Sequence, residues 1–137
     1  MKGMCTSKGK RRVWWRPKVP RSLGQQGEDA AVRHLKRAGY TILARNQFLG
    51  RFEIDIIARE GDTIAFVEVR TRATRDEIPP EDTIGPTKQH RIRQAAQRYM
   101  DARDEEVGVY YRFDVVSVIL PETGKPDIRL IRDAFQG

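Results

Sequence analysis

The sequence has few of the residues that mark disulfide-bonded, cysteine-metal or membrane proteins. Its single cysteine, Cys5, cannot form an internal disulfide, and no His or Cys lies at metal-ligand spacing from it. The longest apolar run near the amino terminus, residues 13–15, is too short for a membrane span or the hydrophobic region of a signal peptide. We therefore expect a soluble, unsecreted, cytoplasmic protein that makes no contact with a membrane.

Acidic residues are absent from the first 27 positions, which carry eight basic side chains. The rest of the chain has 18 basic and 19 acidic residues, so the net charge of +7 comes from this segment alone. We predict a basic, disordered tail at residues 1–21 and one domain at residues 22–137. Such a tail can bind phosphates, with Trp14 and Trp15 stacking on bases, or serve only as a solubilising extension.

The hydrophobic pattern predicts an α/β domain with the element order α-β-β-β-α-β-β. Ser22 and Gln25 resemble a capping box at the start of the first helix, and Pro86 is placed to open the second. A segment rich in proline and acidic residues before Pro86 predicts a loop. The expected first helix is 22–38, the expected strands are 40–46, 52–60, 63–72, 110–120 and 128–131, and the expected loop is 76–85.

A two-residue turn at residues 61–62 predicts a hairpin between the second and third strands. In this register Asp55 lies opposite Glu68, and Glu53 lies opposite Arg70. We expect these four charged side chains to share one face, with apolar side chains on the other face: Ile54, Ile56, Val67 and Val69.

Two carboxylates directly opposite each other on neighbouring strands repel each other. A divalent cation that prefers oxygen ligands, such as Mg²⁺, would compensate Asp55 and Glu68. The alternative is a salt-bridge ladder on a solvated face, in which Arg70 and Arg72 neutralise the acids. The spacing alone favours this second interpretation.

Ordered motifs extend from residue 22 to residue 135, and together they are similar to the YraN-type family of restriction-endonuclease-like proteins. No single motif is specific, but the blocks occur in order and at compatible spacings. They are Gly24, Gly27 and Glu28; Arg45-Asn46; Glu53-Ile-Asp55-Ile-Ile-Ala58; Phe66-Val-Glu68-Val-Arg70-Thr-Arg72; Lys88; Arg112-Phe113-Asp114-Val115-Val116; and Asp133-Ala134-Phe135.

The resemblance implies a restriction-endonuclease-like fold, a mixed central β-sheet flanked by helices, and a PD-(D/E)xK-type site related to that of archaeal Holliday-junction resolvases. It implies that Glu28, Asp55 and Glu68 bind Mg²⁺ or Mn²⁺. The activity it implies is that of a metal-dependent DNA endonuclease, a hydrolase of phosphodiester bonds. DNA is then the expected partner, and a homodimer like that of the resolvases is one expectation.

Two positions depart from the family pattern. Arg70 occupies the usual lysine position, and a guanidinium can stabilise charge but cannot act as a general base. Phe52 replaces a glycine and adds bulk where a phosphate backbone would approach. Lys88, the only lysine between Lys36 and Lys125, is placed to supply an amine from the second helix, or is simply solvent-exposed.

Three functions therefore remain open. The first is a metal-dependent nuclease, and the second is a catalytically impaired nucleic-acid-binding module, which Arg70 favours. The third is a protein-interaction adaptor whose acids form only a charge ladder. Metal affinity discriminates them, because a nuclease needs it, a binding module can retain it and an adaptor should lack it.

Overall fold

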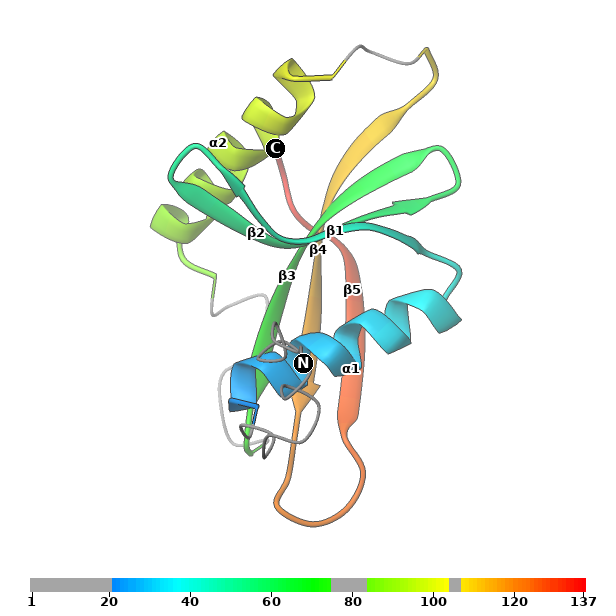
Figure 1. Cartoon of the computed structure of the whole chain (residues 1–137), viewed down its shortest axis with the longest axis vertical. Helices are drawn as coiled ribbons and strands as arrows, with labels where there is room; N and C mark the ends of the chain where they lie inside the picture. Colours follow the sequence, from blue (N-terminus) through cyan, green and yellow to red (C-terminus); the bar gives the residue numbers. More distant parts are fainter. Residues whose placement is uncertain (1–20, 75–83, 104–106) are drawn as a thin grey trace, which may run out of the picture.

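Five strands form one mixed sheet in the order β1-β2-β3-β4-β5 (Figure 1). The computed structural model describes residues 21–74, 84–103 and 107–137. Only the β3–β4 pair is parallel, and the connection between these two strands contains α2. The predicted α/β class, element order and helix-flanked mixed sheet are confirmed. The elements are α1 Leu23–Arg37, β1 Thr41–Leu49, β2 Phe52–Glu60, β3 Thr63–Arg72, α2 Pro86–Asp101, β4 Tyr110–Ile119 and β5 Asp127–Phe135.

Several predicted segments lie outside these residues. The tail falls at residues 1–20, and most of the predicted loop falls at residues 75–83. Within the described part of the chain, no helix is long and apolar enough to cross a membrane.

The amino terminus of α1 is fixed by the predicted capping box. The backbone N–H of Gln25 donates to the Ser22 hydroxyl at 3.1 Å, and the Gln25 side chain accepts from the Ser22 N–H at 3.0 Å. The next turn of α1 lies very close to β3, because a Cβ added at Gly27 would fall 1.9 Å from the Thr71 Oγ1 atom. Gly27 therefore permits the close approach that sets the following residue, Glu28, beside β3.

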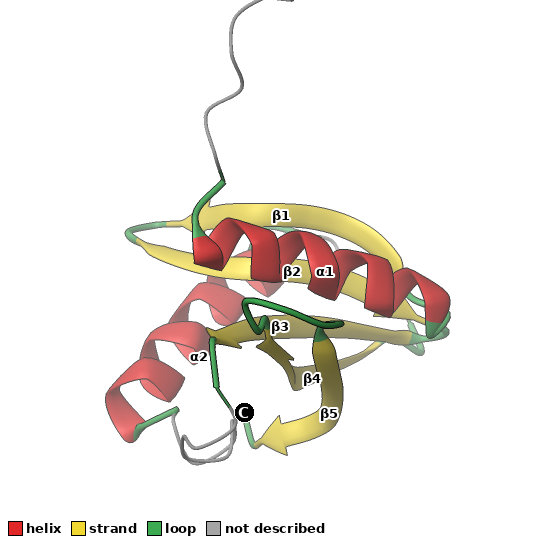
Figure 2. Cartoon of the chain, turned by 90° about the horizontal axis from the view of Figure 1, so that it is seen from below, coloured by secondary structure: helices red, strands yellow, loops and turns green. Residues whose placement is uncertain are grey.

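Two apolar layers cover the faces of the sheet, with α1 and α2 on opposite sides (Figure 2). The α1 layer includes Leu35, Ile56 and Val67, whereas the α2 layer includes Ile54 and Ile92. The expectation that Ile54 shares a face with Ile56 and Val67 was wrong. Regular alternation would put Ile54 and Ile56 on one side, whereas they belong to opposite layers, and the pairing of β2 with β3 ends at Ile56, before Asp55.

Two strands are longer than predicted. β1 continues three residues beyond Asn46, which adopts φ 48 within the strand. β5 extends to Phe135, which pairs with Phe113 beyond a register shift between Phe113 and Val115 of β4. The hairpin strands β2 and β3 have the bounds that the sequence predicted.

Candidate active site

A cavity of about 410 Å³ opens between the amino-terminal part of α1 and the second half of β3. Three of the five predicted site residues come from different elements and line this cavity together: Glu28 from α1, Asp55 from β2 and Glu68 from β3. Arg70 lines it as well. The remaining lining residues are Gly24, Val69, Thr71 and Arg72.

The cavity lies where two strands lose their regular geometry. The predicted hairpin register holds from Glu60↔Thr63 to Ile56↔Val67. Beyond that pair, the Asp55 carboxylate inserts toward β3 and accepts a hydrogen bond from the Val69 backbone N–H at 2.9 Å. A side chain therefore replaces a backbone partner here, which fixes the carboxylate against the neighbouring strand.

Asp55 and Glu68 form a pair of like charges, in which Glu68 is buried and Asp55 is half-buried. The Glu68 residue is only 4% exposed. Burial, and next the negative charge of Glu68, raise the pKa of Asp55 to about 7. The solvated face that the ladder interpretation assumed is not found at Glu68, which is buried, although Arg70 does approach this acid. Keeping both carboxyl groups ionised near neutral pH therefore costs free energy.

Glu28 is oriented by β1 across the same cavity. Its carboxylate accepts a hydrogen bond from the Asn46 side-chain amide at 2.8 Å and is 3.5 Å from an Arg45 guanidinium nitrogen. Arg45 pairs more closely with Asp29, at 2.8 Å. Asn46 therefore contacts the site, and it does not end the strand, since β1 continues to Leu49. Sequence reasoning assigned Arg45 no role, although it precedes Asn46 in the motif.

Two cations approach the same oxygen of Glu68. The Arg70 Nη1 atom lies 3.4 Å from Glu68 Oε2, and the Lys88 Nζ atom lies 3.6 Å from it. Lys88 therefore extends from the first turn of α2 to the carboxylate pair, and it is not merely a solvated lysine. Both distances are long for ion pairs, and both cations are partly exposed, so they can exchange partners with a ligand.

The acids fit a divalent cation that binds through few protein ligands. Asp55 and Glu68 offer hard carboxylate oxygens, and Mg²⁺ commonly uses one or two carboxylates together with water and substrate phosphate. Among the described residues, no three His, Cys, Asp or Glu side chains lie together as a ready-made metal site. The donor set thus fits a two-carboxylate centre, with Glu28 held on the other side by Asn46. The three-ligand set stays a prediction.

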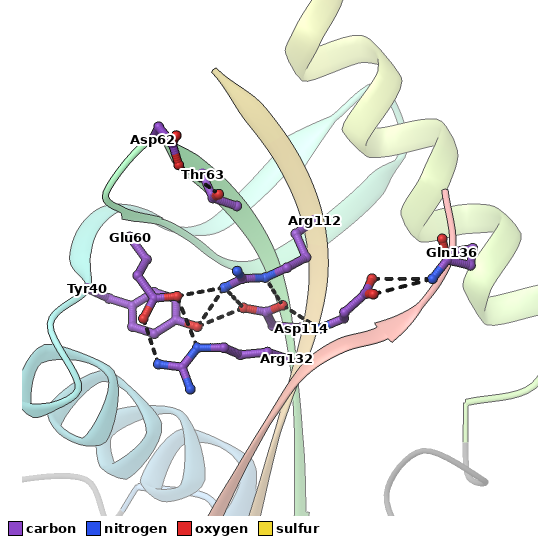
Figure 3. Close-up of polar contacts among 9 residues, drawn as sticks. Tyr40, Glu60, Asp62, Thr63, Arg112, Asp114, Arg132 and Gln136 are labelled. Carbon is purple, nitrogen blue, oxygen red and sulfur yellow. Dashed lines mark hydrogen bonds and ion pairs between the residues drawn. The ribbon is translucent and has the colours of Figure 1, made fainter. Parts of the chain in front are cut away.

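A second polar cluster lies away from this cavity and involves residues to which the sequence had assigned no role (Figure 3). The fully buried Asp114 accepts hydrogen bonds from the Tyr40 hydroxyl, the Arg112 guanidinium and the Asp133 backbone N–H. Glu60 binds Arg112 and Arg132, and the bonds from Arg132 lower the Glu60 pKa to about 2. Because its carboxylates are all paired, the cluster is suited to joining strands, not to binding a ligand.

Comparison with known proteins places the chain in a family. The profile of the Uncharacterised protein family UPF0102 matches residues 27–118. The chain belongs to this family. The resemblance to YraN-type proteins is thereby confirmed, and the matched segment contains all five predicted site residues.

The curated relatives span nearly the same length as this chain. A UPF0102 protein of Sorangium cellulosum is 42% identical over 117 residues, covering 84% of this chain and 81% of the relative. One from Caldicellulosiruptor saccharolyticus is 44% identical over 116 residues, covering 84% and 98%. These matches include most of the described sheet and both helices.

A solved structure shows a weaker likeness. It is that of Pyrococcus furiosus SfsA in complex with Ca²⁺, with 14% identity and a TM-score of 0.34. The likeness covers 80% of this chain and only 62% of the SfsA chain. At this level it supports no statement about activity.

Proposed function

We propose that this protein is a metal-dependent nuclease that hydrolyses DNA phosphodiester bonds at the Asp55–Glu68 pair. The observation that carries the proposal is the pair of adjacent carboxylates, one buried and one half-buried, that line a cavity beside two exchangeable cations. Such a pair is destabilising by itself, and a divalent cation would remove the repulsion.

A bound Mg²⁺ or Mn²⁺ would polarise the phosphodiester and lower the pKa of an attacking water. The protein's own residues would then position the reactants. Asp55, held by the Val69 N–H, and Glu68 would supply the ligating oxygens. Glu28, fixed by Asn46, would accept a hydrogen bond from water at the opposite wall of the cavity.

Lys88 and Arg70 would have different tasks. Both would move from Glu68 to the phosphate once a metal neutralised the carboxylates. The Arg70 guanidinium would stabilise negative charge on the phosphoryl oxygens, because it stays protonated. The Lys88 amine can exchange a proton, so it would take the part of the lysine that the family pattern places at residue 70. The basic segment at residues 1–21 would add nonspecific attraction to the DNA backbone.

The second candidate is a nucleic-acid-binding module without turnover, and the observation that favours it is Arg70 at the usual lysine position. The two candidates differ in the importance of Lys88. In a nuclease, Lys88→Met lowers the cleavage rate by about 10²-fold or more, as loss of a proton-transfer group does. In a binding module, the same substitution affects only affinity.

The test is cleavage of end-labelled single-stranded, duplex, flapped and four-way-junction DNA with Mg²⁺ or Mn²⁺. We expect cleavage by the wild type and by Asp62→Asn, an exposed acid in the turn of the same hairpin, but none by the Asp55→Ala, Glu68→Ala double variant. Binding without cleavage of all four substrates, unchanged in an Arg70→Lys variant, would contradict the nuclease and favour the binding module. Equal cleavage by wild type and double variant would refute the assigned site.

A further inference from the structure

A second cleft, of about 250 Å³, lies between the tip of the β1–β2 hairpin and the first half of α2. It is smaller than the roughly 300–1,000 Å³ of typical small-molecule sites, so it suits one part of an extended ligand. Phe48 presents an aromatic side chain there, since this residue is 63% exposed. The described residues that line it are Phe48, Arg51, Phe52, Glu53, Lys88, Arg91 and Ile92.

Two arginines converge on one ring in this cleft. The guanidinium carbons of Arg51 and Arg91 lie 5.3 Å and 5.9 Å from the centre of the Phe52 ring. In the described part of the chain, neither guanidinium has a carboxylate partner or a hydrogen-bond acceptor, whereas Arg45, Arg112 and Arg132 are ion-paired. Cation–π contact therefore orients Arg51 and Arg91 but leaves their N–H groups available to an anion.

The cleft adjoins the candidate active site through two residues. Lys88 lines the cleft and also lies 3.6 Å from Glu68. Glu53 lines the cleft and lies two residues before Asp55 on the same strand, β2. A strand with one phosphate at the carboxylate pair would thus place a neighbouring nucleotide in the cleft.

We propose that this cleft binds one unpaired nucleotide of a DNA strand, with its base stacked on Phe48 and its phosphate contacted by Arg51 and Arg91. Aromatic stacking and arginine contacts to phosphate are the two elements of single-strand recognition. The inference rests on the proposed function, and it specifies the substrate class as DNA with a single-stranded segment beside the cleavage point. In continuous duplex both faces of each base are already stacked, so Phe48 would gain nothing.

Among the described residues of the lining, Glu53 is the one acid, and its position limits how the nucleotide lies. A carboxylate repels phosphate but accepts hydrogen bonds from base amino groups. The phosphate is therefore expected on the side of Arg51 and Arg91, with the base edge toward Glu53. Phe52 stands where the family pattern has a glycine. In this arrangement its ring orients both guanidiniums, which a glycine could not do.

Binding measured without cleavage tests the cleft separately from catalysis. The full-length protein is titrated in EDTA with a fluorescein-labelled single strand and with a blunt duplex of the same sequence, at several salt concentrations. The variants are Phe48→Leu and the double variant Arg51→Gln, Arg91→Gln. The matched control is Arg37→Gln, an exposed arginine in the last turn of α1.

We expect Phe48→Leu to weaken single-strand binding about fivefold or more, the effect of losing one base stack, and to leave duplex binding unchanged. The double arginine variant should lower the salt slope for the single strand by about 0.7, because the one phosphate that both arginines contact is no longer neutralised. Arg37→Gln should change neither quantity. The tail contributes equally to every protein in the comparison.

The proposal is overturned if the wild type binds no single strand, if Phe48→Leu and the arginine variant bind like the wild type, or if duplex binding falls as much as single-strand binding. If the variants show the expected changes in binding but the wild type cuts no DNA, the proposed hydrolysis is refuted and the cleft is supported. Metal-dependent cleavage with unchanged binding in all variants would refute the cleft and support the hydrolysis.

Discussion

Replacing Asp55 by asparagine should stabilise the metal-free protein in a pH-dependent way. The pKa of Asp55 rises from 3.8 to about 7 in the fold, first because of burial and then because of the Glu68 charge. Between these two values the folded state binds a proton that the unfolded state lacks. The free energy of unfolding of the wild type therefore falls as pH rises from about 4 to about 7. Above pH 7 this group lowers it no further.

The magnitude follows from the size of this pKa rise. One pKa unit corresponds to about 1.4 kcal/mol, so the rise to about 7 corresponds to at most about 4 kcal/mol. Asparagine keeps an oxygen that can accept the Val69 N–H bond but carries no charge. Relative to wild type, Asp55→Asn should be near neutral at pH 4 and more stable by up to about 4 kcal/mol at pH 8.

Urea denaturation in EDTA at pH 4, 6 and 8 measures this difference. The Asp62→Asn variant is the control, because this acid lies in the exposed hairpin turn. Comparison of each variant with wild type at the same pH cancels the other titrating groups, such as Glu60, whose lowered pKa acts in the opposite direction. A difference between Asp55→Asn and wild type that is independent of pH would refute the repulsion between Asp55 and Glu68.

Three further changes test the parts of the fold that support the site. Gly27→Ala should cost about 1–3 kcal/mol in urea denaturation, because its Cβ would overlap a β3 side chain, whereas Gly24→Ala, with 4.0 Å of clearance, should be neutral or stabilising. Tyr40→Phe should cost about 1–3 kcal/mol by the same measurement, because it removes one hydrogen-bond donor to the buried Asp114. Tyr110→Phe, at an exposed position, is the control. An equal cost for both variants would contradict this reason. Asp114→Ala should cost about 3–5 kcal/mol, since it leaves the Arg112 charge without its principal partner, and a loss below 1 kcal/mol would show that the cluster does not join the strands.

The hairpin and the carboxylate pair could be predicted because a two-residue turn fixes the register of both strands. Glu60↔Thr63 follows from the turn, and this register, which holds as far as Ile56↔Val67, brings Asp55 and Glu68 close together. The irregularity at Asp55 could not be predicted, because a period of two places Ile54 and Ile56 on one face. The Asp55 carboxylate takes the place of a backbone acceptor for the Val69 N–H. This contact depends on tertiary packing, which the local sequence pattern does not indicate.

Long-range contacts account for the other omissions. Asp114 and Tyr40 are 74 positions apart, and a buried Asp in the strand β4 gives no indication of its donors. The contact of Lys88 with Glu68 depends on how α2 packs, so the sequence could suggest it only as one of two alternatives. The cleft at Phe48 and Phe52 could not be predicted, because it forms only where α2 packs beside the β1–β2 hairpin and leaves Phe48 exposed.

Mn²⁺ binding followed by electron paramagnetic resonance tests the central claim most directly, because the signal of free Mn²⁺ decreases as the ion binds. The titration compares the wild type with the Asp55→Ala, Glu68→Ala double variant, and Asp62→Asn serves as the control. We expect the wild type and the control to bind Mn²⁺ at a site that Mg²⁺ competes for and that the double variant lacks. Equal Mn²⁺ binding by the wild type and the double variant, or none by either, would contradict the assignment of the carboxylate pair as a metal site.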